Sequence, residues 1–232
     1  MRDNALNVRL CSCASLVRQD AVFADIGTDH AYLPLFLLRT GVIKKAFCSD
    51  VNEGPLAKAR ENAETSGFSD KVTLILTDGA SALDGKGITD YAICGMGGEL
   101  IADIISAAPH LKDGSLRLIL QPMTKQSHLR RYLLSEGFRI DSEVYSEEGH
   151  RRYVCFSATY TGECRSIDPT EAEICAKDAD IVNKSVQIRY LNDKLKAYKK
   201  MIEGKKQGGE ESFSDCEIAL AIEKYIKEWT TI

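Results

Sequence analysis

The sequence predicts a doubly wound α/β domain followed by an antiparallel helical hairpin that resembles a coiled coil. Short apolar runs alternate with helix-like segments through residue 135, two strand-like stretches follow, and a seven-residue apolar repeat begins near residue 170. Alternating strands and helices are typical of a parallel sheet covered on both faces. The 232 residues therefore divide into a domain over 1–162 and a helical hairpin over 163–232.

The elements of the domain follow from hydrophobic periodicity and from helix stop residues. Gly41 and Gly67 each lie just past an expected helix, and Pro55 lies near the first turn of another. In order, we expect a helix over 4–18, a strand over 21–26, a helix over 31–40, a strand over 45–50, a helix over 54–66, strands over 71–76 and 91–94, a helix over 100–107, a strand over 116–120, a helix over 127–135, and paired antiparallel strands over 138–145 and 152–160.

The hairpin is predicted from two apolar stripes. Residues 170–203 carry a seven-residue repeat typical of a coiled-coil helix, and the glycines of 204–209 end it. The members of the first stripe are Ile174, Ile181, Ile188, Leu195 and Ile202, and those of the second are Ile218, Ile222, Tyr225 and Trp229.

Residues 168–180 carry five acids and one lysine, whereas 184–206 carry eight basic residues and two acids. The basic block is either a solvated helix face or an arm that contacts phosphates.

Composition excludes several classes of protein. The hydrophobic fraction of 44% supports a core, and no window approaches 18 consecutive apolar residues, so no transmembrane helix is expected. The first residues lack the pattern of a signal peptide. Eight scattered cysteines without a C-x-x-C motif predict a reducing, cytoplasmic location and no metal site. The net charge of −4 gives no overall electrostatic argument for nucleic acid.

A glycine turn follows the first predicted strand. Asp25 lies near the end of that strand, and Gly27, Thr28 and Asp29 lead into the next helix, where backbone N–H groups point at a ligand. Asp50 ends the second strand, 23 residues after Gly27. An acid at that place can accept hydrogen bonds from two ribose hydroxyls. Together the two features predict a nucleoside-containing cofactor.

The turn lacks the full G-x-G-x-x-G pattern of dinucleotide enzymes. Its two carboxylates, Asp25 and Asp29, would repel a pyrophosphate and attract a cation. S-adenosylmethionine (SAM) carries a sulfonium and an ammonium group, and its ribose would meet Asp50. SAM is therefore the expected cofactor, and NAD and FAD are disfavoured. Taken singly, Asp25 and Asp29 could instead be a strand terminus and a helix N-cap.

Two further turns follow later strands at the same expected edge of the sheet. Asp78, before Gly79, is placed to accept a hydrogen bond from the adenine amino group, or is an ordinary β-turn acid. Gly95, Gly97 and Gly98 would let the backbone approach a cofactor or a target base closely. A tight strand-to-helix turn alone would explain one or two of them.

Methyl transfer from a sulfonium is an in-line displacement that needs proximity and an available lone pair. N1 of adenine is such a nucleophile and becomes cationic on methylation. A nearby carboxylate would stabilise that charge or accept an N6 proton. Asp29 is the candidate catalytic residue, and His30 beside it can hydrogen-bond locally.

The motifs ADIGTDHAYLP over 24–34, DVNEGPL over 50–56, GMGG over 95–98 and LILQP over 118–122 resemble the bacterial TrmK family, the tRNA (adenine(22)-N1)-methyltransferases. The resemblance covers about residues 5–160, and the helical hairpin also fits. It implies a class I, Rossmann-like SAM-dependent enzyme that methylates N1 of an adenine in the D-arm region of tRNA. The candidate SAM-binding residues are Asp25, Gly27, Thr28, Asp29, His30, Asp50, Asn52, Asp78, Gly79, Gly95, Met96 and Gly97, with Asp29 also catalytic.

The expected substrate site departs from the family at one position. Many relatives carry Asn after the Gln-Pro pair, whereas this chain has Met123, so Gln121 would have to serve in part, with Pro122 shaping the loop. The target N1 is hidden in a paired base, so the enzyme should select an unpaired or flipped nucleotide. The candidate residues for tRNA contacts are Gln121, Pro122, Lys125, Arg130, Arg131, Arg152, Lys196, Lys199 and Lys200. A monomer is favoured.

Two other functions remain open from the sequence. The chain could be a SAM enzyme that acts on a small molecule or a protein, in which case the basic helix is merely solvated. It could also be a non-catalytic module that binds a nucleotide or oligomerises through the coiled-coil-like helix.

Overall fold

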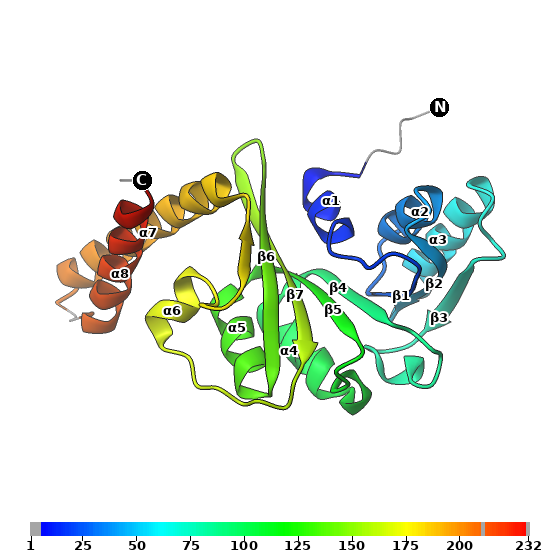
Figure 1. The fold of residues 1–232 in the computed structure, drawn as a ribbon. Helices are drawn as coiled ribbons and strands as arrows, with labels where there is room; N and C mark the ends of the chain where they lie inside the picture. Colours follow the sequence, from blue (N-terminus) through cyan, green and yellow to red (C-terminus); the bar gives the residue numbers. More distant parts are fainter. Residues whose placement is uncertain (1–5, 210–211, 231–232) are drawn as a thin grey trace.

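The structure, a computed structural model, describes residues 6–209 and 212–230 (Figure 1). Within these residues, eight strands form one sheet in the order β3-β2-β1-β4-β5-β7-β6-β8. β7 runs antiparallel to β5 and β6, and the other neighbours are parallel. The strands are β1 (Ala21–Ile26), β2 (Ile43–Asp50), β3 (Val72–Leu76), β4 (Asp90–Gly97), β5 (Arg117–Thr124), β6 (Phe138–Glu148), β7 (Arg151–Tyr160) and β8 (Asp180–Val182).

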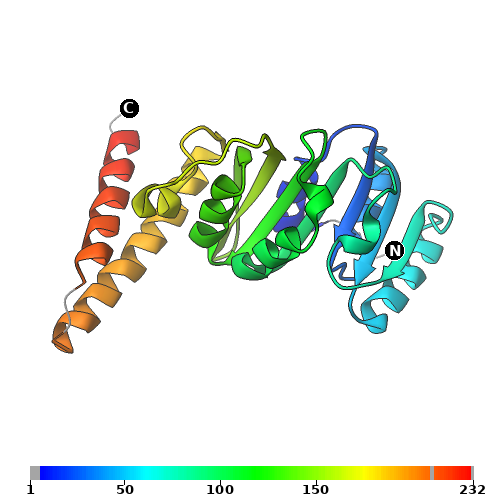
Figure 2. The same cartoon turned by 90° about the horizontal axis from the view of Figure 1, so that it is seen from below.

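The helices cover both faces of the sheet and extend beyond one end of it (Figure 2). They are α1 (Val8–Ala14), α2 (Tyr32–Arg39), α3 (Glu53–Thr65), α4 (Gly98–Ser106), α5 (Gln126–Ser135), α6 (Pro169–Ile174), α7 (Lys184–Gln207) and α8 (Phe213–Thr230), with short 3₁₀ turns at Ser81–Leu83 and Pro109–Leu111. In the described part of the chain, no helix combines the length and hydropathy needed to cross a bilayer.

The core consists of two layers, one on each face of the sheet. Phe23 of β1 belongs to the layer that contains the buried residues of α1, α2 and α3, whereas Ala24 and Ile26 belong to the layer that contains those of α4 and α5. Because both faces are covered, the central strands are almost continuously apolar rather than alternating. The predicted doubly wound α/β class is confirmed, including the antiparallel pair of strands near its end.

The N-terminal helix is shorter than predicted. It begins at Val8, because the Asn7 side chain accepts a hydrogen bond of 2.9 Å from the Leu10 N–H and caps it. It ends at Ala14, and the apolar Leu16 and Val17 that follow are buried in the core without being helical. Residues 4 and 5 of the predicted helix lie outside the described residues.

The predicted start of the long helix is wrong. Ile174 ends the separate helix α6, and Ile181 lies in β8, which pairs with β6 at the edge of the sheet. The chain turns out of the helix at Cys175, and the Ala176 N–H then donates a 2.8 Å hydrogen bond to the buried Glu143 carboxylate. Backbone bonds to a free sheet edge and to a buried acid outweigh the heptad pattern at this place.

The remainder of the predicted hairpin is confirmed as the pair α7 and α8, which lie side by side at one end of the molecule (Figures 1 and 2). Leu191 and Leu195 of α7 are buried against Ala219 and Ile222 of α8. Gly204 does not end the first helix, which continues to Gln207. The division of the chain at residue 162 stays a prediction, although β8 extends the sheet past that residue.

Gly98, at the start of α4, lies very close to the backbone of Lys125, and a sequence pattern cannot reveal this contact. A Cβ atom there would lie 2.3 Å from the Lys125 carbonyl oxygen, on backbone that cannot easily move. Gly98→Ala is therefore expected to lower the free energy of unfolding by about 1–3 kcal/mol. Urea unfolding measures the change. Gly204→Ala is the matched control: its Cβ would meet open space inside a helix, so it should stabilise by about 0.5–1 kcal/mol. Equal effects of the two substitutions would contradict the close approach.

Candidate active site

The four predicted loops meet at one edge of the sheet. In the register of the parallel strands, Asp25 on β1 lies beside Cys48 on β2 and Ala92 on β4. Asp50 at the end of β2 lies beside Leu76 at the end of β3. The turns that follow these strands therefore share the carboxyl edge, where open α/β sheets bind ligands. The convergence predicted from the sequence is confirmed.

Asp25 is a buried carboxylate at the base of this edge. It is 7% exposed, and its Oδ2 accepts a 2.6 Å hydrogen bond from the Thr28 hydroxyl. Burial raises the pKa of Asp25 to about 6; the Thr28 hydrogen bond and the Arg9 charge oppose this shift, and the negative charges of Asp29 and Asp50 add to it. A group with this pKa loses its proton just below neutral pH.

The raised pKa of Asp25 makes the stability of the protein depend on pH. Between about pH 4 and 6 the folded state binds more protons at Asp25 than the unfolded state does, so the free energy of unfolding falls as pH rises. The stabilisation that the protonated Asp25 side chain gives is fully present below the pKa that Asp25 has in the unfolded chain. It is lost above about pH 6, and it amounts to at most about 3 kcal/mol. Asp25→Asn removes it. Urea unfolding from pH 4 to 7.5 should show wild type losing stability relative to Asp25→Asn, and a constant difference would refute this.

Gly27 forms the tight turn after β1. Its φ of +69° is a left-handed conformation that favours glycine. A Cβ on Gly27 would lie 2.0 Å from the Met96 methyl carbon, so the side chain of Met96, near the end of β4, lies directly against the turn. The structure thus brings two of the predicted cofactor-binding residues into contact.

The other predicted cofactor-binding side chains lie at the ends of β2 and β3. The Asp50 carboxylate accepts a 2.8 Å hydrogen bond from the Asn52 N–H through Oδ1, which fixes its orientation and leaves Oδ2 without a hydrogen-bond partner among the described residues. The Thr77 N–H bonds to the Asp50 carbonyl oxygen at 3.0 Å, which ties the Asp78 turn to the Asp50 turn. Asn52 and Asp78 are exposed at this edge.

The three glycines at the junction of β4 and α4 are each explained by contacts or backbone conformation within the protein. Gly95 has a φ of +81°, and a Cβ on Gly97 would lie 3.3 Å from the Thr124 hydroxyl. The left-handed backbone accounts for Gly95, and close approach to the end of β5 accounts for Gly97 and Gly98. The three glycines can therefore be explained without a ligand, and the assignment of Gly95 and Gly97 to the cofactor stays a prediction.

Arg9 is a residue of this site that sequence reasoning missed. Its guanidinium donates a 2.7 Å hydrogen bond to the Gln121 side-chain oxygen, which also accepts a 3.2 Å bond from the Gly95 N–H. It thereby brings a positive charge to the loops of Asp25 and Asp29. The sequence contained no signal beyond an arginine in an amphipathic helix, because the contact joins positions 112 residues apart.

Gln121 and Pro122 do not face outward as expected. Both are buried, and the Gln121 amide is used by Arg9, by the Gly95 N–H and by the Pro122 carbonyl oxygen, to which it donates at 3.1 Å. The Gln121 side chain therefore holds the carboxyl end of β4 at Gly95 in this structure. Met123 is the exposed side chain of this segment, at 42%.

Asp29, His30 and Tyr32 lie together at the mouth of the site. The Asp29 carboxylate is exposed, and its Oδ1 lies 3.2 Å from His30 Nε2. The other ring nitrogen of His30, Nδ1, lies 3.1 Å from the Tyr32 hydroxyl. An exposed carboxylate next to the glycine turn is free to meet a substrate, as the sequence predicts for Asp29.

The prediction that Arg130 contacts tRNA is wrong. Its side chain has no exposed area and forms a two-pronged ion pair with Glu143, with Nε–Oε1 and Nη2–Oε2 distances of 2.8 Å. Its third nitrogen donates a 2.7 Å bond to the Ala172 carbonyl oxygen. Position on α5 decides this outcome, because helical periodicity places Arg130 beside the buried Leu129 and Leu133.

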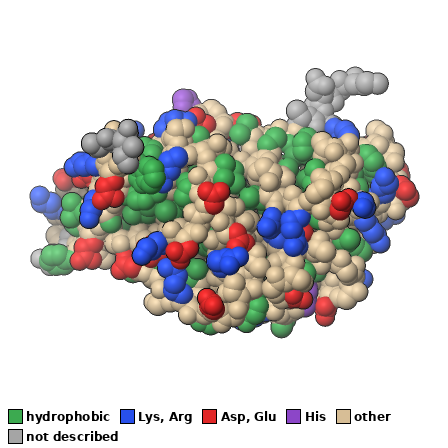
Figure 3. Space-filling model, viewed as in Figure 1, with side chains coloured by type: hydrophobic (Ala, Val, Ile, Leu, Met, Phe, Trp, Pro, Cys, Tyr) green, Lys and Arg blue, Asp and Glu red, His purple; other side chains and the backbone are tan. Residues whose placement is uncertain are grey.

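The other basic residues predicted to contact tRNA reach the surface but are not equally available. Arg152 pairs with Glu147 and Asp193, and Lys199 pairs with Glu223 at 3.3 Å. Lys and Arg are interspersed with Asp and Glu over the hairpin end of the molecule (Figure 3). Within residues 6–209 and 212–230, the exposed residues Arg131, Lys196 and Lys200 have no ion-pair partner. Lys125 lies 3.7 Å from Glu99 beside the active-site loops.

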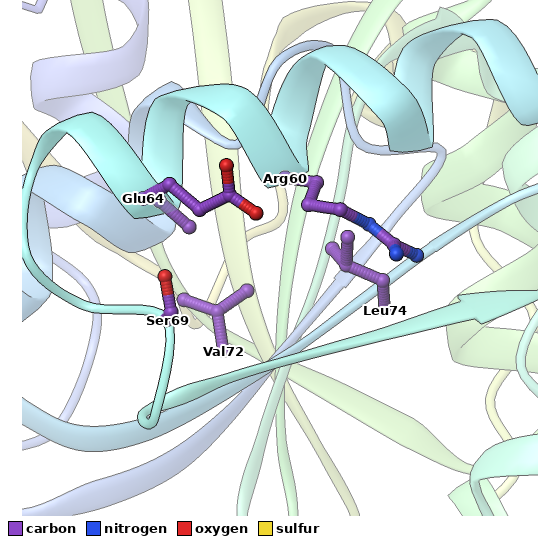
Figure 4. Close-up of a pocket in the computed structure, with 6 residues that line it drawn as sticks. Arg60, Glu64, Ser69, Val72 and Leu74 are labelled. Atoms are coloured by element: carbon purple, nitrogen blue, oxygen red, sulfur yellow. The ribbon is translucent and has the colours of Figure 1, made fainter.

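Two adjoining hollows lie between α3 and the edge strand β3. One, of about 280 Å³, is lined by Arg60, Ala63, Glu64, Ser69, Val72 and Leu74 (Figure 4). The other, of about 500 Å³, is lined by Glu53, Leu56, Ala57, Arg60, Leu74 and Leu76. Leu76 immediately precedes the Asp78 turn, and Glu53 follows Asn52. The second hollow therefore borders the candidate cofactor loops.

Comparison with known proteins identifies the family and the fold. Residues 6–156 match the family model described as "Methyltransferase domain". A tRNA (adenine(22)-N(1))-methyltransferase of Bacillus subtilis is 36% identical over 154 residues, which cover 66% of this chain and 64% of that protein. The match thus spans slightly less than two thirds of the curated relative.

Solved structures are similar over nearly the whole chain. A putative tRNA (m1A22) methyltransferase of Streptococcus pneumoniae, Sp1610, has a TM-score of 0.80 at 28% identity and covers 97% of this chain and 99% of its own. M. capricolum TrmK, in complex with S-adenosyl-homocysteine, has a TM-score of 0.78 at 26% identity, covering 96% and 98%. The resemblance inferred from the motifs is confirmed, and the chain belongs to the methyltransferase domain family.

Proposed function

We propose that this protein is a SAM-dependent tRNA methyltransferase that methylates N1 of an adenine, at position 22 by similarity to its relatives. The observation that carries the proposal is the group of carboxylates at the carboxyl edge of the sheet, Asp25, Asp29 and Asp50, in a chain similar to tRNA m1A22 methyltransferases. A cytoplasmic location and a monomeric state remain predictions.

The charges of the site fit SAM. Burial raises the pKa of Asp25, the negative charges of Asp29 and Asp50 lie close enough to raise it further, and Arg9 supplies one opposing positive charge. A cationic ligand relieves this repulsion, whereas a pyrophosphate would increase it. Asp50 would hold the ribose through its second carboxylate oxygen, and Asp78 the adenine amino group. SAM would supply a methyl group on a positively charged sulfur.

Exposed apolar side chains surround the same loops. Tyr32, Val51, Leu76, Leu100 and Met123 are each more than 40% exposed, and all lie at or beside the turns of the carboxyl edge. Several large apolar side chains exposed to solvent near one another indicate a binding site, because exposed apolar patches mark such sites. Flat apolar surfaces beside acidic groups suit two nucleobases, that of the cofactor and that of the target nucleotide.

Asp29 is the residue we assign to the reacting base. Adenine gains a positive charge as the bond from N1 to the methyl carbon forms, and a carboxylate already in place stabilises that charge without reorganising. The exposed Asp29 carboxylate can approach a base that has left its stack. The Asp25 carboxylate cannot, because it is buried and hydrogen-bonded to the Thr28 hydroxyl. The buried Gln121 would position the loop opposite the base.

Mass spectrometry of nucleosides tests the function directly. Bulk tRNA incubated with the protein and methyl-labelled SAM should yield labelled 1-methyladenosine, and fragment mapping should place it at position 22. Calorimetry with SAM and S-adenosyl-homocysteine tests the cofactor separately. Binding of SAM without methylation of any tRNA would favour a different substrate, and no binding by a folded sample would end the proposal.

The tRNA surface is proposed to include α7. If Lys196, Lys199 and Lys200 contact phosphates, reversing all three to glutamate should lower the slope of log affinity against log salt by about 2–3. Filter binding over a series of salt concentrations measures the slope. The control reverses Lys58, Lys71 and Lys86, which lie in the half of the chain remote from the hairpin and change the net charge equally. The same slope in both triple variants would remove α7 from the tRNA surface.

A further inference from the structure

The mouth of the site contains a chain of three polar groups that the proposed reaction does not by itself require. Asp29 Oδ1 lies 3.2 Å from His30 Nε2, and His30 Nδ1 lies 3.1 Å from the Tyr32 hydroxyl. The His30 and Tyr32 rings also pack edge to face, with centroids 5.4 Å apart. The imidazole is thus held between the candidate catalytic carboxylate and a phenol.

The backbone is strained where it presents these groups. His30 and Ala31 have φ values of +62° and +57°, and neither is a glycine. Two consecutive left-handed residues of this kind cost about 1–2 kcal/mol each. The Asn62 side chain on α3 donates a 2.9 Å hydrogen bond to the His30 carbonyl oxygen, and Ala31 is fully buried. Such strain persists only where the surroundings enforce it, and it gathers at functional sites.

The two contacts can become one hydrogen-bonded chain in a single tautomer of a neutral His30. A carboxylate can only accept, so Nε2 would carry the hydrogen that faces Asp29. Nδ1 would then be the acceptor for the Tyr32 hydroxyl, so that Tyr32 would select the tautomer. Such a chain would orient a carboxylate that is otherwise exposed and free to rotate.

We propose that His30 is a positioning residue that holds the Asp29 carboxylate toward the methyl-accepting base, with Tyr32 selecting its tautomer and Asn62 securing its backbone. This inference rests on the proposed function. His30 and Tyr32 touch neither the reacting nitrogen nor the methyl group in this assignment. They act through Asp29, in the way that an orienting residue acts on a catalytic group.

Kinetics provide the first test. His30→Leu should lower kcat about 10-fold while KM for SAM changes less than about 2-fold, because orientation of Asp29 is lost and cofactor binding is retained. His30→Gln can donate to Asp29 and accept from Tyr32, so it should recover most of the rate. His150→Leu, an exposed histidine in the turn between β6 and β7, is the matched control and should leave both constants unchanged.

A double-mutant cycle separates positioning from a general structural role. His30→Leu should have no further effect on kcat in an Asp29→Asn background, because its target is already disabled. A full additional 10-fold loss there would overturn the proposal. Thermal unfolding of each variant identifies any that fail to fold, and His30→Gln then supplies the comparison.

A spectroscopic test does not depend on activity. In protein with ¹⁵N-labelled histidine, the His30 signal, assigned by its loss in His30→Leu, should show the Nε2–H tautomer, and Tyr32→Phe should give a mixture. A dominant Nδ1–H tautomer in wild type would refute the arrangement. If wild type methylates no tRNA, the proposed function fails, whereas the tautomer result still decides how His30 faces Asp29.

Discussion

Asp29→Asn is expected to lower kcat for tRNA methylation at least about 100-fold, the loss seen when one preorganised electrostatic contact to a developing charge is removed. The substitution keeps the shape of the side chain and removes only its negative charge. Single-turnover methylation with saturating SAM isolates the step in which the adenine becomes cationic. A rate within a few-fold of wild type would show that the carboxylate is not catalytic.

The fold should survive this change. The Asp29 side chain is 83% exposed and contributes no buried contact, so the thermal midpoint should stay close to that of wild type. Asp70→Asn, which alters an exposed acid in the turn before β3, is the matched control and should keep full activity. SAM affinity measured by calorimetry shows whether Asp29 also contributes to cofactor binding.

The second large effect is expected at the buried ion pair of Arg130 and Glu143. The Glu143 carboxylate also accepts 2.7 and 2.8 Å hydrogen bonds from the Tyr145 hydroxyl and the Ala176 N–H. Burial by itself would lower the pKa of Arg130, but Glu143 and Tyr145 outweigh it and raise the pKa. Glu143→Leu leaves the guanidinium buried without a counter-charge, and should lower the free energy of unfolding by about 3–5 kcal/mol.

The double variant Arg130→Met with Glu143→Leu tests this explanation. It replaces both charges by apolar groups, so it should be more stable than Glu143→Leu alone. Urea unfolding followed by circular dichroism measures both variants. A double variant that is less stable than the single one would show that Arg130 contributes mainly through its bond to the Ala172 carbonyl oxygen and its packing on Phe156.

Local sequence patterns predicted the helices and strands that are defined by their own residues and by the turns that flank them. β1 and α2 lie within one residue of their expected bounds, and Gly41 and Gly67 end helices with φ values of +72° and +74°. The loops that follow the parallel strands could be placed together because parallel strands end at one edge. That rule brought Asp25, Asp50 and Asp78 to a common site without any knowledge of their contacts.

Contacts between distant segments decided what the patterns could not. The bond from Arg9 to Gln121 turned an expected base-reading side chain into a brace for the carboxyl end of β4. The burial of Arg130 converted an expected phosphate contact into part of the core. Net charge along a helix does not reveal which basic residues find acidic partners, as Lys199 does with Glu223.

By itself, the sequence determined the doubly wound fold, the acidic turns and the helical hairpin, because periodicity and turn chemistry act over a few residues. Only the tertiary structure decided where α6 ends, how β8 joins the sheet and how His30 lies between Asp29 and Tyr32. Free sheet edges and buried charges find their bonding partners in segments far along the chain, and a strained turn persists only in one backbone conformation. These interactions therefore exist only once the chain has folded.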